Sequence, residues 1–469
     1  MPRELPEIIT FVVLIAVAFF LGKIITDATF VPLAIGAGLL VALLTFQNPS
    51  NGLILIVFSM LLSPEIKIAD IPGRPVVMRL DDILIIVMFL AWLARRASMK
   101  DTKGFEKTPL DVPLIALISV YLVSTCLGIL IGKLNPMRSF FYLLRYVEYF
   151  ILYWLTANIV ADKKEIPRYL TAGFLTLVAV TVFAYSLFNS APRVYAPFDT
   201  EATGVRAIAS VKAGEPASLG GYYLVIFAIL FSFFMYGKTQ LVRLGSLATA
   251  LLMMPPFVKT LSRASYLAFI PLLLSLLILT KKRRNTLGAL LLAGTLIFPF
   301  FFRGLYQNMM ERVMQTFTVS GYLGTYNVGG KRITDPSAME RIISWKKVVQ
   351  EKILKNPATI LFGTGITGLG FVEGQFFLVL GELGIAGVAA FYLMFFLIIK
   401  HSYRIHLESV ETIPKSLSLA LTGSCIALLF QSLTTNTFVI VRIMEPFWFL
   451  AGLVMTFPKL YETQAPRIS

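Results

Sequence analysis

The stretch 337–387 reads SAMERIISWKKVVQEKILKNPATILFGTGITGLGFVEGQFFLVLGELGIAG, a polar segment that runs into a long apolar one. Ser337 and Glu340 stand at capping-box spacing, and apolar residues then recur at the spacing of a helix. Basic residues occupy the opposite face of this helix: Arg341, Lys346, Lys347 and Lys352. The pattern predicts an amphipathic helix over residues 338–355 that lies on a membrane surface.

A glycine-rich loop follows this surface helix. Asn356-Pro357 is expected to end the helix, because proline disfavours a helical conformation in the residue before it. The glycines that come next predict a tight loop with close backbone approach: Gly363, Gly365, Gly368 and Gly370. The loop delivers Glu373 and Gln375 to the beginning of the next apolar helix.

The composition is that of an all-α polytopic integral membrane protein. Of 469 residues, 57% are hydrophobic and 14% are charged, and the mean hydropathy is +0.77. The net charge of +16 is divided among short basic clusters between apolar runs, which is typical of topology signals and anionic-lipid contacts and argues against nucleic-acid binding. Cys126 and Cys425 lie inside apolar runs, where helix packing is favoured over a disulfide or a metal site.

The apolar runs predict about fourteen transmembrane helices by the ~20-residue spanning rule. The first run, 8–25, lacks a clear small-residue cleavage site and is expected to be an anchor instead of a removed signal peptide. Further runs begin near Phe30, Gly52, Asp82, Leu110, Phe140, Ile166, Leu219, Leu241, Arg263, Thr286, Gln375, Ser416 and Val439. We expect a bundle of about eleven helices over 1–303, an outer loop over 304–374, and C-terminal helices with a cytoplasmic tail over 375–469.

Basic clusters fall on alternate loops, which predicts that both termini are cytoplasmic. Cationic residues nevertheless recur in the segments that then face outward: Arg206 in the loop 189–218, Arg263 at the start of an apolar run, and Arg341 in the surface helix. Such residues run against the topology rule and indicate a ligand, with lipid headgroups as the alternative. A guanidinium group pairs with phosphate oxygens at any pH, so a lipid-linked diphosphate suits these arginines.

The outer loop 64–80 carries Arg74 and Arg79, which are expected to face a substrate or lipid headgroups. Asp81 and Asp82 follow this loop directly before an apolar run. Adjacent acids in that place favour helix capping over metal binding, because a hard cation needs several further oxygen ligands.

The stretch 337–387 resembles the signature region of the O-antigen ligase and polymerase superfamily. The matching residues are Arg341 to Trp345, Asn356-Pro357, Gly363 to Gly365, and Leu380, Glu382, Gly384 and Gly387, with a shorter echo at Thr260, Ser262 and Arg263. One position departs from the pattern, because Glu373-Gly374 stands where the ligases have a histidine as the proposed base. The two histidines of this chain, His401 and His406, lie past the far end of the helix.

The resemblance implies a GT-C-like membrane glycosyltransferase on the outer face of the bacterial inner membrane. Its partners would be a polyprenyl-diphosphate-linked oligosaccharide, an acceptor glycan and membrane lipids, and a chain-length co-polymerase is compatible with this activity. Guanidinium groups would stabilise the charge on the departing diphosphate, so no metal or cofactor is required. The residues expected to bind the diphosphate are Arg206, Arg263 and Arg341.

Glu373 is the candidate base that takes a proton from the attacking hydroxyl, and an acid favoured by the helix dipole is its alternative role. Gln375 is expected to bond sugar hydroxyls or to cap the helix. Glu382 lies some way into the apolar helix and is expected to support the site by bonding an arginine or backbone groups.

The missing histidine favours a polymerase that joins lipid-linked repeat units into O-antigen, capsule or exopolysaccharide. A ligase that transfers the glycan to a lipid, protein or wall acceptor is the alternative. A polyprenyl-linked glycan flippase or another transporter is the rival from a different class. Transporters often consist of two related halves, whereas this chain has one large outer loop near its C-terminal third, which favours an enzyme.

Overall fold

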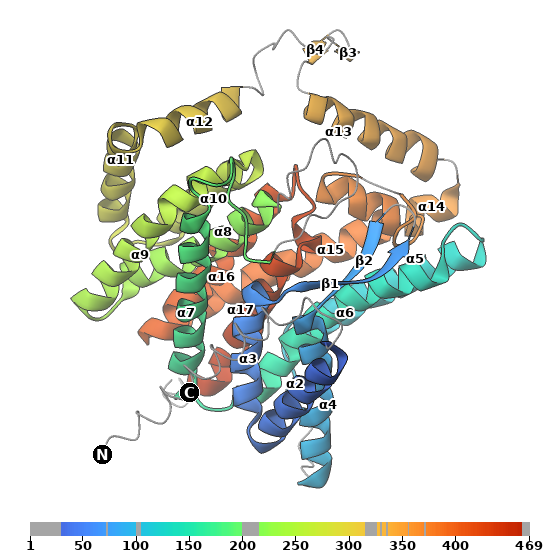
Figure 1. The fold of residues 1–469 in the computed structure, drawn as a ribbon, viewed down its shortest axis with the longest axis horizontal. Helices are drawn as coiled ribbons and strands as arrows, with labels where there is room; N and C mark the ends of the chain where they lie inside the picture. The colour runs from blue at the N-terminus through green and yellow to red at the C-terminus, as the bar shows by residue number, and fades with distance from the viewer. Residues whose placement is uncertain are drawn as a thin grey trace, which may run out of the picture. The chain divides into compact units, whose positions relative to one another are not determined.

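The computed structural model of the protein describes residues 30–71, 74–99, 105–198, 215–314, 326–328, 331–333, 336–354, 356–369 and 372–461. These residues are mainly helical (Figure 1). Seven helices within the described ranges are long and apolar enough to cross a membrane. They are α5 (Asp111–Leu130), α7 (Ile166–Ser186), α8 (Pro216–Tyr236), α9 (Gln240–Lys259), α11 (Arg284–Phe301), α15 (Gln375–Glu408) and α16 (Thr412–Gln431).

The chain is therefore a helical protein of the multi-pass membrane class. Each apolar run expected from residue 30 onward coincides with a helix that begins within about one turn of the expected residue. The remaining helices at these runs are α2 (Phe30–Gln47), α3 (Pro49–Leu62), α4 (Leu80–Ser98), α6 (Pro136–Ile159), α10 (Arg263–Leu279) and α17 (Val441–Tyr461). The expected anchor at 8–25 lies outside the described residues, and the total of about fourteen spans stays a prediction.

The chain forms two compact units. One comprises Met1–Glu106, Ile151–Glu215 and Pro458–Ser469, and the other comprises Lys107–Phe150 and Pro216–Phe457. This division differs from the boundaries that we expect near residues 304 and 375. Those boundaries separate membrane-spanning segments from a loop predicted to face outward, and they do not follow the packing of the chain. The candidate base Glu373 and the candidate ligand Arg341 belong to the second unit.

The first unit is built around α3. Leu53 and Ile56 of this helix are fully buried, and α3 packs against α2, α4 and α7. The hydroxyl groups of Ser50 and Tyr169 lie 2.7 Å apart and join the beginning of α3 to α7. Burial of apolar side chains along α3 thus holds this helical layer together.

A β-hairpin connects α3 to α4. β1 (Glu65–Ile71) pairs antiparallel with β2 (Arg74–Arg79), and Glu65 lies opposite Arg79. The apolar runs did not predict this hairpin. Its sequence signals are the alternation in EIKIADI and the Pro72-Gly73 pair that follows.

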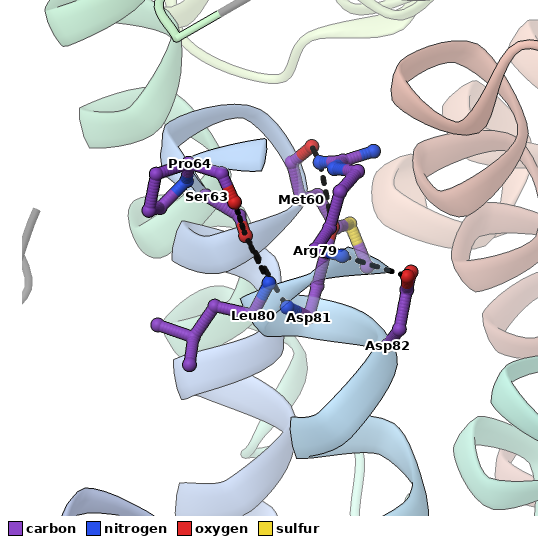
Figure 2. A network of polar contacts seen from close by, with 7 residues as sticks. All are labelled: Met60, Ser63, Pro64, Arg79, Leu80, Asp81 and Asp82. Carbon is purple, nitrogen blue, oxygen red and sulfur yellow. Dashed lines mark hydrogen bonds and ion pairs between the residues drawn. The ribbon is translucent and has the colours of Figure 1, made fainter. Parts of the chain in front are cut away.

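The end of the hairpin is fixed to the two helices by a buried polar network (Figure 2). The Arg79 Nη2 group donates to the Met60 carbonyl at 2.7 Å and forms an ion pair with Asp81 at 2.6 Å. Ser63 Oγ accepts the backbone N–H groups of Leu80 and Asp81 at 2.8 and 3.3 Å. Asp82 accepts the backbone N–H of Arg79, the N-cap residue of α4, at 2.8 Å.

This network tests the expected roles of Asp82 and Arg79. The capping role is confirmed for Asp82, which bonds the backbone directly before α4. The expectation that Arg79 faces a substrate or headgroups is wrong, because its side chain is only 2% exposed and bonds α3 and Asp81. A buried carboxylate beside it compensates the cost of removing the guanidinium from water.

The second unit has α8 and α16 at its centre. Most residues of α8 are buried, and α8 packs against α9, α10 and α16 (Figure 1). Gly220 allows close approach, since a Cβ atom there would lie 2.2 Å from Ser265 Oγ on α10. Gln431 of α16 donates to Ala217 O at 3.1 Å and to Ser265 Oγ at 3.0 Å, so one amide joins three helices.

The segment between α11 and α15 belongs to this second unit and contains short elements. They are α12 (Arg303–Met314), β3 (Tyr326–Val328), β4 (Lys331–Ile333), α13 (Pro336–Lys347), a π-helix (Val348–Ile353) and α14 (Pro357–Phe362). The helix expected over 338–355 is present as α13 and the π-helix that continues it, and its place on a membrane surface stays a prediction. Asn356 caps α14 by accepting the Ala358 N–H at 3.0 Å.

Candidate functional site

The apolar face of the amphipathic helix packs against the beginning of α15. Val348, Ile353 and Val372 form a buried cluster. The side chains packed around this cluster are Trp345, Ile360, Leu369, Phe377 and Leu380. The Trp345 ring stacks on Phe377 with ring centres 4.6 Å apart and an interplanar angle of 13°. Apolar burial therefore fixes α13 relative to the start of α15. Arg341 lies one turn before Trp345, and both bond Glu373, so its expected place on the face opposite the apolar residues is wrong.

The loop before α15 approaches the helix backbone closely. The N–H groups of Thr364 and Gly365 donate to the carbonyl groups of Gly381 and Glu382, each at 2.9 Å. Gly363 has a φ of 71°, and a Cβ atom there would lie 2.3 Å from the Glu382 carbonyl carbon. This is the close approach that the spacing of the glycines predicts.

α15 is broken at Gly384. This residue has φ 68° and ψ −164°, which is not a helical conformation. A Cβ atom on Gly384 would lie 2.4 Å from the backbone of Leu361 in α14. Broken helices with irregular backbone beside them are typical of ligand sites in membrane proteins.

The structure brings Arg341 and Glu373 together. The Arg341 Nε–H donates to Glu373 Oε2, and the two groups form an ion pair in which the side chains are 22% and 34% exposed. The Trp345 Nε1–H donates to the backbone carbonyl of Glu373 at 2.6 Å. A partly exposed guanidinium group and a partly exposed carboxylate thus lie side by side. The guanidinium can bind an anion, and the carboxylate can accept a proton.

A turn after α16 holds the backbone on both sides of Glu373. Asn436 Nδ2 donates to the Val372 carbonyl at 2.6 Å, and the Gln375 N–H donates to the Ser432 carbonyl at 2.9 Å. Gly374, with a φ of 99°, lies between these contacts, and its Cβ position would be 3.3 Å from the Leu433 carbonyl. The carboxylate therefore projects from a backbone segment that is tied down at each end.

Gln375 and Glu382 have structural contacts. Gln375 is fully buried, and its Oε1 accepts the Phe438 N–H at 3.2 Å, so this side chain connects α15 to the turn before α17. Glu382 is 7% exposed and its Oε1 accepts the Thr367 N–H at 2.8 Å. A bond from Glu382 to a loop amide is the supporting role that we expect for it. The expectation that Gln375 bonds sugar hydroxyls stays a prediction.

The other predicted arginines are not joined to this pair by the described contacts. Arg263 is the first residue of α10 and is half-buried, beside the N-cap residue Ser262. Arg206 lies outside the described residues. Convergence of Arg206 and Arg263 on Arg341 stays a prediction. His406 is buried at the other end of α15, where its Nδ1 lies 2.8 Å from the Lys415 carbonyl.

Two residues at the site are absent from the sequence-based prediction. Ser124 of α5 donates to the Glu382 carbonyl at 2.5 Å, and Asn436 bonds the Val372 carbonyl. Asn436 carries a weak signal, since a polar amide between two apolar runs often has a specific bonding partner. Ser124 carries no such signal, because serine is common in packed membrane helices.

Trp345→Phe is expected to destabilise the second unit by about 1 kcal/mol, because phenylalanine keeps the stacking on Phe377 but cannot donate to the Glu373 carbonyl. Thermal unfolding in detergent measures this loss. Trp345→Ala serves as the comparison and is expected to cost about 3 kcal/mol or more, since it also removes buried aromatic area. A Trp345→Phe protein with unchanged stability would show that the indole N–H contributes nothing.

No protein-family model matches the chain, and a search of curated proteins finds no match. The site and fold define a multi-pass helical membrane protein with an Arg–Glu pair at the start of a broken helix.

Proposed function

We propose that this chain is a membrane glycosyltransferase that polymerises lipid-linked repeat units on the outer face of a bacterial inner membrane. The observation that carries the proposal is the partly exposed Arg341–Glu373 pair. Trp345 bonds the Glu373 backbone directly before α15, the helix that is broken at Gly384. The proposal includes the finer architecture expected from the sequence, with about fourteen spans, a GT-C-like arrangement and cytoplasmic termini. The resemblance of residues 337–387 to the O-antigen ligase and polymerase superfamily supports the substrate class.

The proposed reaction uses the two charged groups in different roles. A hydroxyl oxygen of the acceptor sugar attacks the anomeric carbon of the donor glycan, and the bond from that carbon to the diphosphate oxygen breaks. The electron pair leaves with the polyprenyl diphosphate, and Arg341 stabilises the added negative charge. The hydroxyl proton passes to the Glu373 carboxylate, which is the general base.

This division of labour needs no oxidant, reductant or added nucleophile, because the acceptor hydroxyl is the nucleophile and the diphosphate is the leaving group. A guanidinium group can also donate two parallel hydrogen bonds to two oxygens of one phosphate group. Arg206 and Arg263 are proposed as further diphosphate ligands.

The test is reconstitution of the whole protein in liposomes with a polyprenyl-diphosphate repeat unit from its own host, followed by separation of products by size. A ladder of lengthening products supports the polymerase. A single transfer to an added lipid, protein or wall acceptor would replace the polymerase by a ligase. Movement of intact donor between leaflets without a new bond would overturn the enzyme altogether and make the protein a transporter.

A further inference from the structure

The Arg341–Glu373 pair leaves part of each group available. A guanidinium group has five N–H donors in a planar fork, and Arg341 uses its Nε–H on Glu373 Oε2. Neither terminal nitrogen of Arg341 bonds another described residue, and neither does Glu373 Oε1. With the side chains 22% and 34% exposed, the outer edge of the guanidinium and one carboxylate oxygen can be reached by a ligand.

The unused edge of Arg341 has a defined chemistry. Its two terminal nitrogens present parallel N–H groups, which match two oxygens of one phosphate group. A phosphate bound there would share the single positive charge of Arg341 with Glu373. The two anions would then compete for that charge, because each is attracted to the guanidinium and repelled by the other.

No second cationic group among the described residues contacts the Glu373 carboxylate. Among the described contacts of Glu373, the guanidinium of Arg341 is the only cationic one. The nearby Trp345 donates to the backbone carbonyl of Glu373 and not to its side chain. The attraction that holds the carboxylate therefore depends on what else Arg341 binds.

We propose that Arg341 couples the donor to the base: a diphosphate on the terminal edge of the guanidinium withdraws its charge from Glu373, so the carboxylate accepts the acceptor's proton only when the donor is in place. This coupling rests on the proposed function and specifies its regulation. Without donor, Glu373 Oε2 stays in the ion pair with Arg341. With donor, the same arginine stabilises the leaving group and releases the base.

The coupling predicts an unusual binding result. Glu373→Gln removes the competing charge and is expected to bind farnesyl diphosphate, a short polyprenyl diphosphate, about tenfold more tightly than the unaltered protein. Arg341→Gln is expected to weaken binding, and adding Glu373→Gln to Arg341→Gln is expected to produce a smaller gain, because only the direct repulsion between carboxylate and diphosphate is then removed. Isothermal titration calorimetry on the full chain in detergent measures all four affinities and forms a double-mutant cycle.

A matched control lies on the same helix. Glu408 pairs with the Arg404 Nε at 2.7 Å at the other end of α15, so Glu408→Gln removes an equivalent charge far along the helix and is expected to leave the affinity unchanged. If Arg341→Gln does not fold, Arg341→Met takes its place in the cycle, because it also removes the charge and keeps a long side chain at this position. The same tightening by Glu373→Gln with and without an arginine at position 341, or no tightening at all, would overturn the coupling.

Failure of the coupling and failure of the glycosyltransferase proposal are separable. The calorimetric cycle involves no turnover, whereas the liposome assay reports product. Coupled binding without product formation would leave Arg341 as a diphosphate-sensing group in another kind of membrane protein. A product ladder with additive affinities would leave the enzyme and remove the coupling.

Discussion

Glu373→Gln is expected to lower the rate of glycan transfer at saturating donor by a factor of about 10² to 10⁴, which is the usual contribution of a general base. The substitution keeps the size of the side chain, and its amide oxygen still accepts the Arg341 Nε–H. The amide group cannot take a proton near neutral pH, so the base function is lost, and saturating donor keeps the change in donor affinity out of the measured rate. Initial rates of product formation in donor-loaded liposomes measure the effect.

Two variants make this result specific. Glu408→Gln removes a paired carboxylate from the far end of the same helix and is expected to keep the rate within about twofold. Glu373→Asp keeps the carboxylate but draws it back by one methylene group, and an intermediate rate is expected. A Glu373→Gln protein that retains most of its rate would show that the carboxylate only holds Arg341 in position.

Gly384→Ala is expected to destabilise the second unit by about 3 kcal/mol or more, because the new Cβ atom meets backbone and the residue has a positive φ. The Cβ position lies 2.4 Å from the Leu361 carbonyl carbon, and backbone atoms cannot rotate away as a long side chain could. Thermal unfolding in detergent measures the loss. Activity is expected to fall as well, since the break also positions the helical turn of α15 that contains Glu382.

The control for Gly384→Ala is Gly245→Ala in α9, where a Cβ atom would meet nothing within 4 Å. Alanine there is expected to change stability by less than about 1 kcal/mol and to favour the helix, because glycine is the poorer helix former. Comparable losses at the two positions would mean that the break in α15 is not determined by the close approach of α14.

The sequence predicts the helices well because apolar length is a direct consequence of spanning a membrane. It does not predict which helices are interrupted, and Gly384 looks the same in the sequence as Gly387, which lies in the helical part. The difference arises from the backbone of α14, which crosses Gly384 and not its neighbour. The hairpin has local signals in EIKIADI and Pro72-Gly73, whereas the burial of Arg79 depends on a contact with α3 that no local pattern indicates.

The candidate site was predicted in part. The sequence indicates Arg341 and Glu373 for separate roles, and their direct pairing depends on the rotation of α13 that the stacking of Trp345 on Phe377 determines. Asn436, in the turn after α16, and Ser124, in α5, contact segments distant in sequence, and no local pattern indicates these partners. Residue type indicates chemistry, whereas tertiary packing decides which groups meet.

The two backbone bonds from Thr364 and Gly365 to the carbonyl groups of Gly381 and Glu382 also limit how this region can vary during evolution. A single insertion or deletion between the paired segments would shift Glu373 and Trp345 out of register with each other, even if every residue type were kept. Homologous chains are therefore expected to differ freely in length elsewhere between α11 and α15, while the distance along the chain from Gly363 to Gly384 stays constant. An alignment of such chains would show this segment as a block without gaps.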